Sequence, residues 1–167
     1  SVPPGLTDAF QLTLGLWTAD GGRVFRDTLE AAGTKELHPF MQTVLQVCKG
    51  GERSAGDFNT LLVEWENFRR RMLQFMQGFD LIIGPVLPFA AIPHGKSFED
   101  KYFLEFRHTM LHNLTGWPVV TIRVGTTPDG LPIGVQIAAA PWRDDVALAA
   151  AKCVETELGP WSMPPRL

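Results

Sequence analysis

The stretch from Asn113 to Ala140, NLTGWPVVTIRVGTTPDGLPIGVQIAAA, contains two apolar runs separated by a turn signal. The runs Val119 to Val124 and Ile133 to Ala138 are rich in β-branched residues, which favour strands. Between them lies Pro128-Asp129-Gly130, a pattern typical of a reversal because glycine accepts a positive φ and proline presets φ just ahead of it. The stretch therefore predicts a β-hairpin.

The two predicted strands are apolar almost throughout instead of alternating with polar residues. Such strands are typical of a sheet that is covered on both faces, as in a layered α/β protein. A third, short strand is predicted at Leu81-Ile82-Ile83, and Pro85 and Pro88 prevent its extension. Three strands that are apolar on both faces would leave an exposed hydrophobic edge, so we expect further strands from outside this chain.

Helical periodicity accounts for most of the remaining sequence. The strongest pattern runs from about Ser54 to Gln77, where apolar residues recur at steps of three and four and predict a core-facing stripe. Its members are Phe58, Leu61, Leu62, Trp65, Phe68, Met72, Phe75 and Met76. Other helices are predicted through Phe10 to Trp17, with Thr7 or Asp8 as cap, and over Val24–Ala32, Lys35–Lys49, Tyr102–Leu114 and Asp144–Leu158.

These elements predict the α/β class and one partial domain spanning residues 1–167. Residues 1–78 are expected to be mainly helical, and residues 79–160 to run strand, helix, hairpin, helix. Residues 161–167, which include Met163-Pro164-Pro165, are expected to form an extended tail.

Composition narrows the classes of function. The 167 residues are 45% hydrophobic and 20% charged, with a net charge of −3, which is ordinary for a globular protein and argues against nucleic-acid binding. Cys48 and Cys153 lie far apart, and we expect both to be reduced and mostly buried. The N-terminal residues lack the pattern of a signal peptide, and the start at Ser1 is compatible with a piece of a longer protein. We expect a cytoplasmic location.

The sequence contains no recognisable catalytic centre. No serine stands in a G-x-S-x-G turn, and Ser54 is interpreted as a helix cap. His108 and His112 are four apart on one predicted helix, a spacing that can bind a metal, but no Glu lies between them and no third ligand is evident. We favour a structural role for both and predict no metal and no cofactor, while an independent metal-dependent hydrolase stays as a third hypothesis.

Three motifs in order resemble the C-terminal part of the amidase signature enzymes: Asp80-Leu81-Ile82-Ile83-Gly84-Pro85-Val86-Leu87-Pro88, Asn113-Leu114-Thr115-Gly116-Trp117-Pro118, and Gly130-Leu131-Pro132-Ile133-Gly134-Val135-Gln136-Ile137. The match covers about Phe79 to Leu158. A weaker resemblance, to the fatty-acid amide hydrolase branch of the family, rests on Ala19 to Phe25 together with Ala140-Pro141-Trp142.

The resemblance implies a serine hydrolase of amides or esters, built on a mixed sheet in an α/β/α arrangement. The family's two serines and its lysine lie in the N-terminal half and have no counterpart here, so no catalytic residue is carried over. The implied partners are an N-terminal catalytic part and a small-molecule amide. The resemblance also leaves peripheral membrane association open.

The resemblance suggests roles for individual residues. In glutamine-using members an acidic residue seven positions before the motif Asn helps recognise the substrate, and here that position is Phe106, which favours an apolar substrate group. Trp117 and Phe89 are the other pocket candidates. Structural roles are expected for the motif residues Asn113, Gly116, Pro118, Gly134 and Gln136. The alternative function is a stand-alone binding or assembly module, with a homodimer that pairs the hairpin edges.

Overall fold

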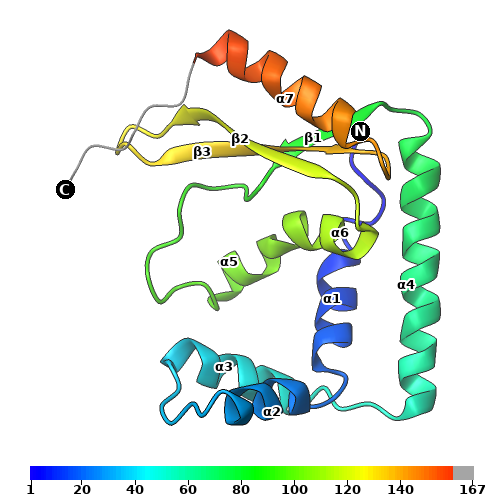
Figure 1. Ribbon diagram of the computed structural model, residues 1–167, viewed down its shortest axis with the longest axis vertical. Helices are drawn as coiled ribbons and strands as arrows, with labels where there is room; N and C mark the ends of the chain where they lie inside the picture. Colours follow the sequence, from blue (N-terminus) through cyan, green and yellow to red (C-terminus); the bar gives the residue numbers. More distant parts are fainter. Residues whose placement is uncertain (160–167) are drawn as a thin grey trace.

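A computed structural model describes residues 1–159, with helices alone in the first half and strands alternating with helices in the second (Figure 1). The first-half helices are α1 (Ala9–Thr18), α2 (Arg23–Ala31), α3 (Pro39–Cys48) and α4 (Ala55–Met76). The second half runs β1 (Leu81–Pro85), α5 (Asp100–Phe103), the 3-10 turn η1 (Leu104–Phe106), α6 (Arg107–Thr115), β2 (Val119–Thr126), β3 (Pro132–Ala139) and α7 (Asp144–Leu158). The predicted extended tail, 161–167, lies outside the described residues.

The predicted hairpin is confirmed and lies within a three-stranded antiparallel sheet of order β1-β3-β2. Its turn closes where expected, with Gly130 at φ +84° and its N–H donating to the Thr127 carbonyl. In the central strand β3, Ile137 lies opposite both Ile83 of β1 and Val120 of β2. The register of β2 shifts between Arg123 and Gly125.

Helices cover both faces of the sheet, as the apolar strands predict. On one face α7 packs against β2 and β3, and on the other the Gln136 side chain reaches the backbone of α6; Figure 1 shows α7 and the α5–α6 segment on opposite sides of the strands. Coverage is complete only in the second half of β3, where Gln136 to Ala139 are buried. Ile83 of β1 stays 59% exposed.

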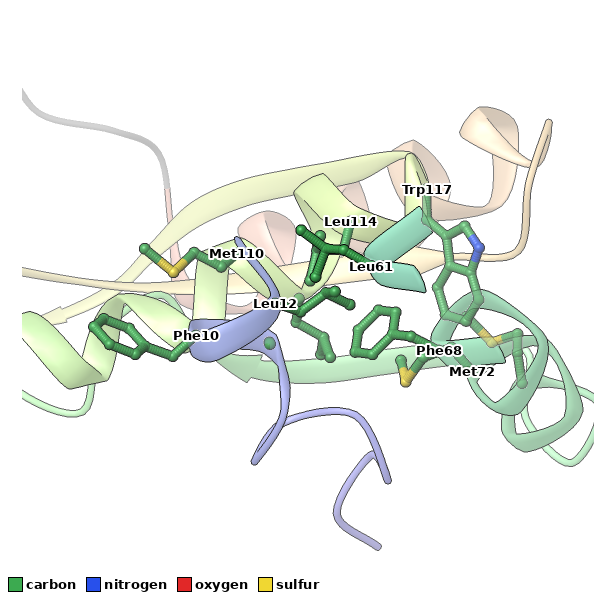
Figure 2. Close-up of a cluster of buried hydrophobic side chains, with 11 residues drawn as sticks. Phe10, Leu12, Leu61, Phe68, Met72, Met110, Leu114 and Trp117 are labelled. Atoms are coloured by element: carbon green, nitrogen blue, oxygen red, sulfur yellow. The ribbon is translucent and has the colours of Figure 1, made fainter. Parts of the chain in front are cut away.

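The core lies where α1, α4 and α6 meet. Side chains from these three helices and Trp117 form one buried cluster (Figure 2), whose members are Ala9, Phe10, Leu12, Leu61, Phe68, Met72, Met76, Met110, Leu111, Leu114 and Trp117. Ser54 caps α4, with its hydroxyl oxygen accepting from the Asp57 N–H at 3.1 Å. The stripe predicted on α4 is therefore mostly core. Phe58 is the exception at 37% exposure, since the buried positions of α4 begin one turn later at Leu61.

Two helices differ from the sequence prediction. The helix expected from Lys35 begins only at Pro39, because His38 Nδ1 accepts from the Phe40 N–H at 3.1 Å and proline suits the first helical position. The single helix expected over Tyr102–Leu114 is divided into α5, η1 and α6. The bounds of α1 agree with the prediction, but Asp8, one of its two expected caps, makes no side-chain capping bond and instead pairs with Arg71 at 2.6 Å.

The two cysteines also differ from each other. Cys48 is buried as expected, whereas the prediction for Cys153 is wrong, since its side chain is exposed. Helix α7 buries Ala147 and Ala151, which are one turn apart, and a residue two positions after Ala151 lies on the opposite side of the helix. No helix within residues 1–159 is long and apolar enough to cross a membrane.

Candidate functional site

An apolar cavity of about 440 Å³ lies among α1, α3 and the α5–η1–α6 segment. Its lining comes mostly from aromatic and aliphatic side chains. The residues are Leu14, Trp17, Thr18, Phe25, Phe40, Met41, Val44, Val47, Cys48, Ser97, Phe98, Phe103, Phe106, Thr109, Met110 and Asn113. A volume of this order is typical of small-molecule sites.

One wall of the cavity follows from the spacing of Phe103, Phe106 and Met110. Steps of three and four place these side chains on the same side of a helical segment, and all three line the cavity. Phe103 is held in place by two aromatic contacts: an edge contact with Phe10 at a ring-centroid distance of 5.1 Å, and a tilted contact with Phe98 at 5.0 Å. The wall is therefore anchored to the core through Phe10.

The opposite wall comes from α3. The Phe40 ring lies 5.0 Å from the Phe98 ring, so an aromatic chain from α3 to α5 closes one side of the cavity. Burial raises the pKa of the Cys48 thiol, which keeps this group neutral. None of these contacts adds a charge to the cavity wall.

The hydroxyl groups at the cavity are mostly satisfied by the backbone. Thr18 Oγ1 donates to the Leu14 carbonyl at 2.9 Å, and Thr109 Oγ1 donates to the Phe106 carbonyl at 3.0 Å. These hydroxyls are thus already engaged, and the cavity can bind a ligand chiefly by removing apolar surface from water. This arrangement suits an alkyl or aryl group better than a charged one.

The three predicted pocket residues do not lie together. Phe106 lines the apolar cavity, whereas Phe89 lines a separate groove of about 800 Å³ beside β1 and the hairpin. Trp117 is only 6% exposed, belongs to the core cluster and borders a third hollow with Arg69. The cavity residues that sequence reasoning did not select include Phe40 and Phe98; the periodicity of the sequence gives no sign that α3 would fold over α5.

The motif around Gly116 joins α6 to the sheet. Gly116 ends α6 in the left-handed region at φ +68°, a conformation that glycine adopts without strain. The carbonyl of Pro118 then accepts from the Ala139 N–H at 3.1 Å, which aligns β2 with β3. Asn113 is exposed at the cavity rim.

Gln136 links three elements. Its side chain is 5% exposed, and Nε2 donates to the carbonyls of Pro85 and His108, each at 2.9 Å. These bonds supply the partners that a buried amide requires. Gly134 was expected to permit a close approach of two backbones. The structure does not show one there, since a Cβ added to Gly134 would lie 3.5 Å from the Ile122 carbonyl oxygen, which is an ordinary contact distance.

Charged groups pair where η1 meets α6. Glu105 accepts from Arg107 at 3.1 Å and lies 3.3 Å from His108 Nε2. Burial, with a smaller effect from the charge of His108, lowers the pKa of His112 to about 4. Within the described residues His112 Nδ1 has no partner, and no group of three metal-ligating side chains occurs. Among residues 1–159, no third ligating side chain accompanies His108 and His112.

Asp20 organises the turn between α1 and α2. Its carboxylate accepts from the Val24 N–H at 2.8 Å and the Gly22 N–H at 2.7 Å. These bonds, above all the one from Val24, lower the pKa of Asp20. Gly21 and Gly22 both take positive φ, at +64° and +78°. The Asp-Gly-Gly sequence thus forms the turn from which α2 begins, and Phe25 of α2 lines the cavity.

A family model described as Amidase matches residues 6–148. The chain belongs to the amidase family. The match includes the three motifs that suggested the resemblance, and it extends through α1 to α4 as well.

Curated relatives of this chain are much longer than it is. The chain is 34% identical over 94 residues to a glutamyl-tRNA(Gln) amidotransferase subunit of Jannaschia sp. (strain CCS1), which covers 55% of this chain and 19% of the relative. It is 27% identical over 153 residues to the fatty acid amide hydrolase of Arabidopsis thaliana, covering 77% of this chain and 25% of the relative. The chain therefore spans about a fifth to a quarter of the curated relatives it matches.

Solved hydrolase structures share the fold of this chain. A 6-aminohexanoate cyclic dimer hydrolase complexed with substrate superposes with a TM-score of 0.79 at 21% identity, over 96% of this chain and 37% of that one. A fatty acid amide hydrolase gives 0.77 at 18% identity, over 95% and 33%. This chain thus corresponds in fold to about a third of these proteins.

Proposed function

We propose that this chain is the C-terminal portion of an amidase-signature serine hydrolase that cleaves amide, or ester, bonds. In this proposal the chain supplies sheet core and substrate-pocket wall, and the catalytic Ser–Ser–Lys centre lies in an N-terminal part outside it. The observation that carries the proposal is the family match over residues 6–148 in a chain that spans only a fifth to a quarter of its relatives.

The composition of the apolar cavity supports an apolar group on the substrate. Phe106 lies in its wall, flanked by Phe103 and Met110, and these side chains favour an alkyl or aryl group over the polar head of glutamine. We propose Phe106 as the substrate-contacting residue of this chain. For Phe89 and Trp117, contact with the substrate stays a prediction about the complete enzyme. In this chain the two residues border hollows that are separate from the cavity.

A serine-directed fluorophosphonate tests the division of labour. The 167-residue chain should stay unlabelled, while the natural polypeptide that includes the sequence encoded upstream of Ser1 should be labelled at a serine outside this chain. Labelling within the 167 residues would contradict the proposal. An upstream sequence without a glycine- and serine-rich nucleophile segment would contradict it as well.

A second candidate is a stand-alone binding or assembly module derived from the same fold. It is favoured by the core, because the cluster of α1, α4 and α6 closes with side chains of this chain alone, and Phe68 and Met72 are fully buried. This candidate predicts cooperative unfolding of the isolated chain and ligand affinity of its own. Non-cooperative unfolding in urea, monitored by Trp fluorescence, would exclude it.

A further inference from the structure

Helices α2 and α3 form a segment, residues 23–48, whose two ends are attached to the rest of the chain at one place. The Arg53 N–H donates to the Ala19 carbonyl at 3.0 Å, so the chain that enters the segment and the chain that leaves it lie side by side. A Cβ added to Gly22 would lie only 2.9 Å from the Cys48 Cβ, which shows how closely the two connections pass. Figure 1 shows α2 and α3 beyond the end of α1, on the side away from the sheet. The segment therefore has a single attachment about which it can rotate.

Burial is confined to this attachment. Gly21, Gly22 and Cys48 are buried, whereas no residue from Arg23 to Val47 is. Removal of apolar surface from water is the main contribution that holds an element in place, and segments with few buried contacts open most readily. The segment is thus fixed at its two ends and held weakly between them.

Charged groups do not hold the segment to the opposite wall of the cavity. In the part of the chain that the structure describes, no ion pair joins residues 23–48 to other residues. Arg26 Nη1 donates to the Gly21 carbonyl at 2.9 Å, but this bond lies within the attachment. The link from α3 to the opposite wall is the aromatic contact between Phe40 and Phe98, whose ring centroids are 5.0 Å apart. A rotation of the segment would therefore break no ion pair and would exchange one set of apolar contacts for another.

The walls of the cavity are only partly covered. Trp17, Phe25, Phe40 and Val47 line it, yet these residues are 58%, 38%, 48% and 36% exposed. Covering apolar surface is favourable by roughly 25 cal/mol for each Å². A ligand in the cavity would give the segment a surface against which these side chains can be covered.

We propose that residues 23–48 are a flap that rotates about its attachment and closes over an apolar ligand in the cavity. In the closed state Phe25, Phe40 and Val47 cover the ligand, and the ligand supplies the contacts that hold the flap. The open state lets the ligand enter and leave. This inference goes beyond the proposed function, because it holds for any apolar ligand of the cavity and does not depend on where a catalytic serine lies.

Distances between spin labels in the natural, complete polypeptide test the flap. One label is placed at Lys35, between α2 and α3, and the other at Lys101 of α5, and both positions are exposed. Attachment through p-acetylphenylalanine leaves the exposed thiol of Cys153 unlabelled. Saturation with N-phenyl-1-naphthylamine, a neutral apolar dye, should narrow the distribution of distances and shorten their mean by roughly 5 Å, the size of a one-turn helix movement.

A control pair of labels separates the flap from the wall that it faces. Labels at Thr60 of α4 and at Lys101 should keep their distance, because neither position belongs to the flap. A distance from Lys35 to Lys101 that stays the same with the dye bound would overturn the proposal, and so would equal shifts in both pairs. Failure of the dye to bind would overturn it as well, since no apolar ligand would then close the flap.

Two neighbouring glycines give a matched pair of variants at the attachment. A Cβ added to Gly51 would overlap the Thr18 side chain, whereas a Cβ added to Gly50 would meet no atom within 4 Å. Gly51→Ala should therefore displace the flap and weaken dye binding at least about tenfold, while Gly50→Ala should leave binding unchanged. Far-UV circular dichroism checks that both variants fold, and the spin-label distances test the flap without either variant. Equal dye affinity in the two folded variants would contradict a hinge at this place.

Discussion

The side-chain nitrogen of Gln136 lies 2.9 Å from the backbone carbonyl oxygen of His108 and so ties the central strand to α6. The same nitrogen donates to the Pro85 carbonyl, also at 2.9 Å. One buried amide thus connects β3 with β1 and with the helix that forms the cavity wall. Its two bonds place the Phe106 segment relative to the sheet.

Replacing Gln136 by Leu should destabilise the chain by about 1–3 kcal/mol, because two carbonyl groups lose their donor while the volume is kept. Urea unfolding followed by Trp fluorescence measures the change. Thr121→Val is the matched control, since Thr121 is the register partner of Gln136 on β2 and is exposed. The control should shift stability by less than about 0.5 kcal/mol. Equal effects of the two variants would remove the special role of Gln136.

Gly116 should be intolerant of a side chain for backbone reasons alone. An added Cβ would meet no atom within 4 Å, yet φ is +68°, so Gly116→Ala should cost about 1–2 kcal/mol through left-handed strain. Gly134→Ala is the comparison, because that glycine does not have a positive φ and its Cβ would make ordinary contacts. Thermal unfolding should show a lower midpoint for the first variant and little change for the second. A larger loss at Gly134 would contradict this account.

His112 should make stability depend on pH. Burial lowers its pKa from the ordinary value of 6.5 to about 4, so the unfolded chain binds a proton there more readily than the folded chain does. The contribution of His112 to the free energy of unfolding is therefore fully present above pH 6.5. As the pH falls from 6.5 towards 4, this residue should lower the free energy of unfolding by roughly 3 kcal/mol. Unfolding free energies measured across this range provide the test.

The matched variant His112→Gln removes the titrating group. Its stability should fall less steeply than that of the wild type between pH 6.5 and 4. His94→Gln, in an exposed loop, should leave the slope of the wild type unchanged. If all three proteins showed the same slope, acid destabilisation would arise elsewhere in the chain.

The elements that sequence predicted well carry local signals. The hairpin has its turn residues at Pro128 to Gly130, and α7 runs from Asp144 to Leu158 as its acidic start and glycine end indicate. The start of α3 was misplaced because His38 acts as a cap, and histidine is a much less frequent cap than Ser, Thr, Asp or Asn. The sequence thus predicts the boundary of a helix well when its capping residue is a common one.

The relation between distant residues could not be predicted in this way. Phe106, Phe89 and Trp117 border three different hollows, since their proximity depends on how α3 and the loops pack. Cys153 has apolar neighbours in sequence but lies on the side of α7 that faces away from the buried alanines. Periodicity shows which residues share a helix face, and tertiary packing decides which face is covered.

The last prediction separates the two hollows that hold Phe106 and Phe89. A neutral apolar dye, N-phenyl-1-naphthylamine, should bind the 440 Å³ cavity with enhanced fluorescence. Phe106→Asp should weaken this binding at least about tenfold, because it places a carboxylate in an apolar wall. Phe89→Asp, in the other groove, should leave it unchanged, and far-UV circular dichroism checks that both variants fold. Loss of dye binding only in Phe89→Asp would move the apolar site from the α5–α6 wall to the groove beside β1.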